Sequence, residues 1–222
     1  MKRLLVAVGL VGVLVGIGLF AIPAFAETDQ HGHLEENLLS VKPFEALSNT
    51  KAPSITKPDW YNKRSVTYSV SSNGSLVGSL PEFAAQANAT LNDPRGWSQL
   101  GVKFVQVDSG GMFTLILAQA STLPNYSSGC SADWSCAVGR NVIINDDRWM
   151  GATSSWNAAG GGLRDYRHMV VNHEVGHWLG HDHAYCGGAG TKAPVMQQQS
   201  IGLQGCSFNP WPLASEMWSS RL

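Results

Sequence analysis

Residues 171–185 read VNHEVGHWLGHDHAY, and this short stretch holds four of the chain's seven histidines. An imidazole ring is costly to bury unless its nitrogens find partners. Such a concentration of rings therefore indicates a ligand that takes several neutral imidazoles together. A metal ion is the ligand that fits this description.

The spacing of the first two histidines defines one side of the site. His173 and His177 are four residues apart, so on a helix both rings can reach one ion from the same face. Glu174 is offset toward the adjoining side, where a water molecule could sit beside the ion. This is the arrangement of a zinc hydrolase.

The third ligand must come from the chain beyond the helix. Gly180 is expected to end the helix, because glycine tolerates the positive φ that a side chain resists. His183 follows three residues later and completes the pattern HExxHxxGxxH. A turn after Gly180 could present His181 or Asp182 instead, but the spacing favours His183, with His181 outside the ligand set.

The expected ion is Zn²⁺, and the expected chemistry is hydrolysis. Three neutral imidazoles leave zinc with an open fourth position, where water becomes a nucleophile near neutral pH. Glu174 would take the proton of that water and pass it to the leaving amine. We therefore expect a metalloendopeptidase acting on peptide or amide bonds. The alternative is a non-catalytic zinc-containing domain that binds a peptide or cell-wall ligand, for which Glu174 would not be needed.

The fold is expected to be mixed. Residues 163–179 contain no proline and place apolar and histidine side chains on one helical face. Upstream, the patterns predict a helix at residues 79–93 and strands at residues 65–71, 101–107, 112–118 and 140–146. Gly110 and Gly111 are expected to form the turn between two of these strands. Strands followed by one long helix and an irregular carboxy-terminal third predict an α+β domain.

The amino terminus has the features of an export signal. Lys2 and Arg3 precede an uncharged apolar run and the sequence AFA at residues 24–26. Residues 1–26 are therefore expected to be a signal peptide, or else an uncleaved membrane anchor. Residues 27–59 are polar and contain prolines, as in a linker, which leaves residues 60–222 as the domain. We expect a protein that is secreted or tethered outside the cytoplasmic membrane.

Charge and size narrow the class of partner. The formal net charge is −1, and removal of Lys2 and Arg3 with the signal would make it −3 (−1 − 2). Nothing in this balance favours nucleic acid as a partner. The expected partner is a protein or peptide substrate, which includes cell-wall peptide, and the expected state is a monomer.

Four cysteines follow the signal, namely Cys130, Cys136, Cys186 and Cys206. In an exported chain an even number indicates two disulfides, with three possible pairings. Proximity favours Cys130 with Cys136 and Cys186 with Cys206. Metal ligation is the competing interpretation, but the spacing lacks the paired CxxC form of structural zinc sites.

Two resemblances extend this interpretation. The zinc motif followed by APVMQQQ, with Met196 thirteen residues after His183, resembles the metzincin metallopeptidases, in which a methionine turn lies beneath the metal. Residues 60–212 resemble the bacterial family called domain of unknown function 3152, typical of secreted or membrane-tethered actinobacterial proteins. The matching pieces are LNDPRGW, GVKF, VIINDDRW, YRHMVVNHEVGHWLGH, APVMQQQ and GLQGCSFNPWP, in this order.

The resemblance implies a zincin-like fold. Such a fold has a twisted mixed sheet, an upper helix and an active-site helix, with zinc between its upper and lower parts. It does not supply a substrate. Some metzincins carry a tyrosine two residues after the methionine, where this chain has Gln198. Stabilisation of an oxyanion would then depend on zinc, on backbone amides, or on Gln197, Gln198 or Tyr185.

Overall fold

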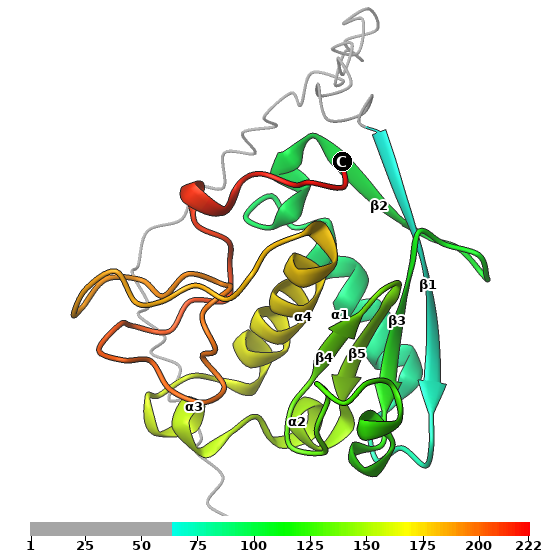
Figure 1. The fold of residues 1–222 in the computed structure, drawn as a ribbon, viewed down its shortest axis with the longest axis horizontal. Helices are drawn as coiled ribbons and strands as arrows, with labels where there is room; N and C mark the ends of the chain where they lie inside the picture. The colour runs from blue at the N-terminus through cyan, green and yellow to red at the C-terminus, as the bar shows by residue number, and fades with distance from the viewer. Residues whose placement is uncertain (1–63) are drawn as a thin grey trace, which may run out of the picture. The chain divides into compact units, whose positions relative to one another are not determined.

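A five-stranded sheet frames the molecule in the computed structural model, which describes residues 64–222 (Figure 1). The expected signal peptide and linker, residues 1–59, lie outside the described residues. The strand order is β2-β1-β3-β5-β4, with β4 antiparallel to β5 and the other neighbours parallel. The strands are β1 (Arg64–Asn73), β2 (Val102–Gln106), β3 (Phe113–Ala118), β4 (Cys136–Val138) and β5 (Asn141–Asn145).

The long strand β1 separates two strands that the sequence suggested would be neighbours. Tyr68 faces Gln106 of β2 on one side and Phe113 of β3 on the other. The end of β2 and the start of β3 therefore lie beside the same residue of β1. The segment that joins them crosses over the backbone of β1 at this residue. Gly111 makes the crossing possible, because a Cβ atom at this position would overlap the backbone of Tyr68. The glycine pair is thus a crossover and not a hairpin turn.

Two long helices form as the sequence predicts. Helix α1 (Leu80–Leu91) begins after Ser79, whose side chain accepts a hydrogen bond from the Glu82 amide, and it has a proline in its first turn. Helix α4 (Leu163–Leu179) has the predicted bounds. The shorter helices are α2 (Asp146–Gly151), α3 (Ser154–Ala158), η2 (Trp97–Leu100), η3 (Ala120–Asn125) and η4 (Ala214–Glu216).

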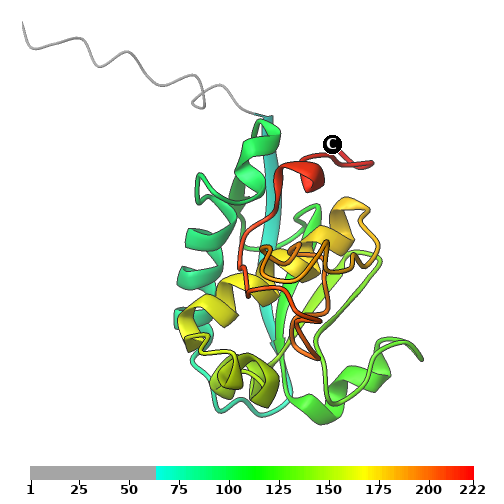
Figure 2. The same cartoon turned by 90° about the vertical axis from the view of Figure 1, so that its left-hand side faces the viewer.

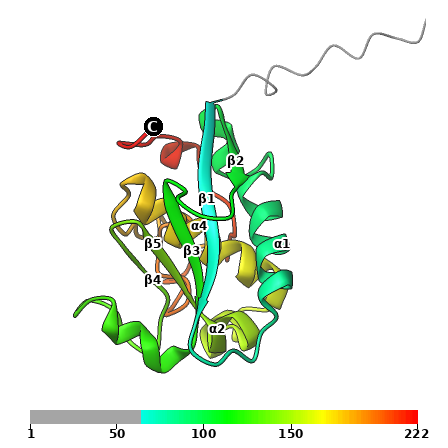
Figure 3. The same ribbon diagram turned by 90° about the vertical axis from the view of Figure 1, so that its right-hand side faces the viewer.

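The main core lies between the sheet and these two helices. Helices α1 and α4 contact each other, α1 lies along β1 and β2, and α4 crosses β4 and β5 (Figure 3). Successive residues of β3 divide between two clusters, as the period of a strand requires. Leu115 and Leu117 join the main core, whereas Ile116 and Ala118 pack with Leu123 of η3 in a second, smaller cluster. The sheet is therefore mixed and mostly parallel, and its two long helices pack together in one core.

The carboxy-terminal third contains no long element among the described residues, as expected. Its loops pack on α4 (Figure 2) and are joined by the bridges Ala184 to Gln197 and Lys192 to Ser207. Both predicted disulfides are present, Cys130–Cys136 and Cys186–Cys206. Disulfides persist in oxidising compartments, so this pairing indicates an extracytoplasmic location. None of the helices in residues 64–222 combines the length and the apolar character needed to cross a bilayer.

Candidate metal centre

Helix α4 presents two histidines, and its end turns the chain back toward them. Gly180 adopts a left-handed conformation, with φ of 105°. The amide of His181 then donates to the Gly176 carbonyl at 3.0 Å, which closes the helix end. This reversal returns the chain along the helix and brings His183 over the face that carries His173 and His177.

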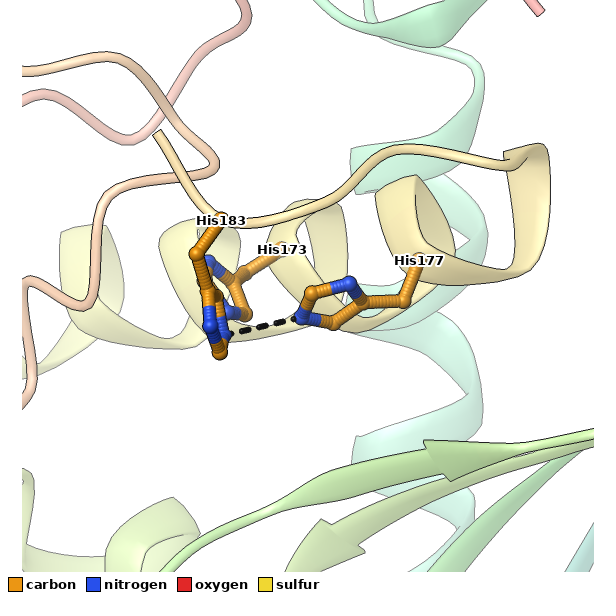
Figure 4. A group of neighbouring side chains, drawn as sticks. All are labelled: His173, His177 and His183. Atoms are coloured by element: carbon orange, nitrogen blue, oxygen red, sulfur yellow. Dashed lines mark hydrogen bonds between the residues drawn. The ribbon is translucent and has the colours of Figure 1, made fainter. Parts of the chain in front are cut away.

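The three rings point toward one another (Figure 4). One nitrogen from each of His173, His177 and His183 lies within 4.8 Å of the other two, and this group can hold a metal ion. The Nε2 atoms of His177 and His183 are 3.2 Å apart. Two nitrogen ligands at the usual zinc distance, in a tetrahedral arrangement, are about 3.3 Å apart. The spacing of this pair therefore already suits a tetrahedral ion.

Backbone carbonyls orient two of the three rings. The Nδ1 atom of His173 is 2.8 Å from the Val195 carbonyl, and Nδ1 of His177 is 2.8 Å from the His181 carbonyl. A carbonyl only accepts, so in each neutral ring the proton is on Nδ1 and the lone pair is on Nε2. Both lone pairs are thus available to a metal, and the rings are held in place without one.

Burial keeps the rings neutral. It lowers the pKa of His173 to about 3, helped by the neighbouring His177. It also lowers the pKa values of His177 and His183. A metal competes with protons for imidazole, so rings that are neutral at pH 7 bind it without first losing a proton. The donor set therefore fits a borderline-soft dication such as zinc.

Glu174 is the second unusual group. Its side chain is buried, and Oε2 has no hydrogen-bond partner among the described residues. Burial raises the pKa of this carboxyl to about 8. A nearby dication would lower the pKa again and favour the carboxylate. A buried acid without a partner is costly to keep, which points to a functional role beside the three rings.

The two competing third ligands lie elsewhere. The His181 ring is buried between Trp97 and Trp218, at centroid distances of 5.0 and 4.0 Å, and its Nε2 is 2.9 Å from the Trp218 carbonyl. Asp182 is exposed at the rim of the cleft and does not belong to the group that can hold a metal. The structure therefore brings His183, and neither of its neighbours, to the other two rings.

Met196 lies against α4 on the side of Gly176. The methionine is buried, and a Cβ atom on Gly176 would overlap its sulfur. The adjoining carbonyl of Val195 is the one that orients His173. The segment around Met196 therefore contacts both the helix backbone and a ring of the metal centre.

A cleft of about 440 Å³ opens over the rings. Helix α4 contributes His173, Glu174 and His177, and the chain after it contributes His183. Trp134 to Ala137 form one wall, and residues 198–201 form the other. None of the described residues that line it is lysine or arginine. The cleft thus places a histidine group that can hold a metal ion between a strand edge and an irregular loop.

The sequence does not predict the cleft wall formed by Trp134 to Ala137. Strand β4 has only three residues and lies in a loop rich in serine, glycine and cysteine, so no periodic pattern marks it. Of the residues considered for oxyanion stabilisation, Gln198 lines the cleft, whereas Gln197 is buried with its amide on the Gly202 carbonyl. Tyr185 is 76% exposed and does not line the cleft.

A comparison with family profiles shows to which protein family the chain belongs. Residues 39–210 match the family described as protein of unknown function DUF3152, and the chain belongs to this family. The match includes all three histidines, Glu174 and Met196. The search of curated proteins finds no match.

Proposed function

We propose that this protein is an exported zinc metallopeptidase that hydrolyses peptide or amide bonds. One observation carries the proposal: three imidazoles, two of them oriented by backbone carbonyls, face one another in an open cleft beside the buried carboxyl of Glu174, whose Oε2 has no hydrogen-bond partner among the described residues. A site that only bound zinc for stability would be closed by a fourth ligand and would have no use for this acid.

The histidines and Glu174 have different roles in the proposed reaction. Bound zinc would supply a Lewis acid for the scissile carbonyl and would lower the pKa of water toward about 7. His173, His177 and His183 would hold the ion, the first two through lone pairs that backbone carbonyls already orient. Glu174 accepts the proton of the attacking water and returns it to the leaving amine. The Glu174 carboxyl suits both transfers because it lies buried beside the rings and its Oε2 has no competing hydrogen-bond partner among the described residues.

The same assignment accounts for the arrangement of elements. We assign a zincin-like fold, in which α4 is the active-site helix and Met196 supplies the methionine turn beneath it. Three features support this assignment: the mostly parallel sheet, its antiparallel edge strand, and the packing of Met196 on Gly176.

The edge strand also favours a peptide as substrate. Among residues 64–222, strand β4 pairs with β5 alone, and Cys136 and Ala137 line the cleft. An extended peptide can add to such an edge through main-chain hydrogen bonds. The substrate is therefore a protein or an amide-linked cell-wall peptide, and the enzyme acts as a monomer outside the cytoplasmic membrane.

The test uses three full-length proteins: the parent, Glu174→Gln and Asp165→Asn. The second substitution also converts a carboxylate of α4 to an amide, but Asp165 does not line the cleft. Zinc content is measured for each, and each is assayed on a diverse peptide library. We expect one zinc in all three, cleavage by the parent and by Asp165→Asn, and a loss of at least about 1,000-fold in Glu174→Gln.

The other outcomes are equally informative. Zinc in all three proteins without cleavage by any would favour the non-catalytic peptide-binding domain. Absence of zinc from the parent would remove the basis of the proposal.

A further inference from the structure

A buried acid that does not line the cleft binds the backbone next to His173. Glu216, in η4, is 6% exposed and does not line the cleft. Its Oε2 accepts from the Val195 amide at 3.0 Å and from the Leu213 amide at 2.7 Å, and its Oε1 accepts from the Met196 amide at 2.9 Å. Neither ion pair among the described residues includes Glu216. Three backbone amides therefore hold this side chain without a cation.

Val195 and Met196, whose amides bind Glu216, also bind the segments that carry His173 and His183 through their carbonyls. The Val195 carbonyl is 2.8 Å from Nδ1 of His173. The Met196 carbonyl accepts from the Ala184 amide at 3.0 Å, and Ala184 is the residue next to His183. The two amides thus bind Glu216, while the two carbonyls hold two segments that carry metal ligands.

This connection has a physical consequence. Ring orientation follows the direction of the carbonyl that binds Nδ1, and that direction is fixed only as firmly as its own peptide unit. Residues 193–199 contain no helix or strand that could fix it. The Glu216 carboxylate does so instead, since charge-assisted hydrogen bonds are shorter and stronger than neutral ones. The segment that supplies it lies beyond residues 39–210, where the family match ends.

We propose that Glu216 is a positioning residue of the metal centre, which orients His173 and the His183 segment through the backbone of Val195 and Met196. It touches neither metal nor substrate. The proposal rests on the metal site of the proposed function, but it concerns affinity for the ion and does not depend on catalysis.

The experiment compares Glu216→Gln with a matched control, Asp146→Asn. Asp146 is also buried and also accepts from two consecutive backbone amides, those of Val77 and Gly78 at 2.6 and 3.1 Å. Among the described residues, no hydrogen bond of its side chain leads to His173, His177 or His183. In Glu216→Gln the side-chain NH₂ group would face at least one backbone N–H, so part of the Val195–Met196 backbone would lose its acceptor. Zinc affinity is measured by competition with a chelator, and the site is examined by the visible absorption of bound Co²⁺.

We expect Glu216→Gln to bind zinc at least about 10-fold more weakly than the parent and to show a changed cobalt spectrum. Asp146→Asn should keep both properties even if it loses comparable stability. If Glu216→Gln does not fold, Glu216→Asp replaces it, because a side chain one methylene shorter cannot reach all three amides. It should bind zinc at least about threefold more weakly.

Three results would overturn the inference. Parent-like zinc affinity and cobalt spectrum in the Glu216 variant would show that the carboxylate only stabilises the fold. An equal loss of affinity in Asp146→Asn would show that affinity follows global stability. A parent that bound neither ion would overturn the metal site itself, and this result is distinct from the other two.

Discussion

The sulfur of Met196 occupies the space in which residue 176 would carry a Cβ atom. Gly176 lies on α4 between His173 and His177, and the ring of Trp97 closes the same space, at 3.0 Å from the position of that Cβ. The absence of a side chain at one position thus lets a buried methionine approach the helix beside His173 and His177.

This contact predicts the effect of Gly176→Ala. The new methyl group must push Met196 away, because the backbone of a helix cannot move locally without disturbing its hydrogen bonds. We expect the free energy of unfolding to fall by about 1–3 kcal/mol, measured by urea denaturation, together with weaker zinc binding. Gly151→Ala is the control, since nothing lies within 4 Å of the added Cβ at the end of α2. Equal effects of the two substitutions would contradict a role for this contact.

A second prediction concerns the identity of the third ligand. His183→Ala should reduce zinc affinity by roughly two orders of magnitude or more, because it removes a direct bond to the ion. His181→Ala should leave the stoichiometry unchanged, since the His181 group that orients His177 is its backbone carbonyl. It should instead lower stability, because its ring packs between Trp97 and Trp218.

Competition titration with a chelator and urea denaturation measure the two effects separately. Asp182→Ala, between the two histidines, provides the local control and should change neither affinity nor stability appreciably. A larger loss of affinity in His181→Ala than in His183→Ala would show that His183 is not the third ligand.

The grouping of the three histidines was predictable because its geometry is local. His173 and His177 share a face through helix periodicity alone, and a glycine at the helix end indicates where the chain turns. The bounds of α4 follow from the same pattern. These features depend on residues fewer than eleven positions apart, so the local sequence is enough to predict where the helix ends and which histidines come together.

Features that depend on distant segments were not predictable. The paired glycines mark a change of direction, but no pattern shows that β1 lies between β2 and β3. Strand β4 exists because it pairs with β5 and is tied by Cys136 to Cys130, both tertiary relationships. Glu216 acts through amides some 20 residues away, and a lone glutamate near a chain end carries no sign of them.

The third prediction concerns pH and His168. This ring is 7% exposed, and its Nδ1 is 2.8 Å from Thr90 Oγ1, which itself donates to the Gln86 carbonyl. Burial, followed by the charge of Arg164, lowers the pKa of His168 below 6.5. The unfolded chain therefore binds a proton more readily. This contribution to stability is present above pH 6.5 and is lost as pH falls from there toward the pKa of the folded state.

His168→Gln tests this contribution, because glutamine can donate to Thr90 but does not titrate. Urea denaturation is carried out at about pH 7.5 and about pH 5.5 with a chelator present, so that the ligand histidines contribute equally to both proteins. We expect the parent to lose more stability between these pH values than the variant. A parallel loss in both proteins would show that His168 remains neutral, or charges equally, in the folded and unfolded chains.

The fourth prediction compares the contributions of the two disulfides to the stability of the protein. Cys186–Cys206 closes a loop with a sequence separation of 20, and Cys130–Cys136 closes one of 6. Loop-closure entropy then gives about 3 kcal/mol for the first and about 2 kcal/mol for the second. Replacing both cysteines of a pair by serine should therefore destabilise the protein more for Cys186 and Cys206, as urea denaturation would show.

The two disulfides should differ in their effect on zinc binding. The 186–206 loop contains Met196 and also residues 198–201 of the second cleft wall, so opening its disulfide should weaken zinc binding as well as substrate binding. Cys136 lies in β4 and lines the cleft, so the loss of its disulfide should raise KM with zinc affinity nearly unchanged. If zinc affinity fell equally in both double variants, it would follow the stability of the whole fold, and the 186–206 loop would have no separate part in zinc binding.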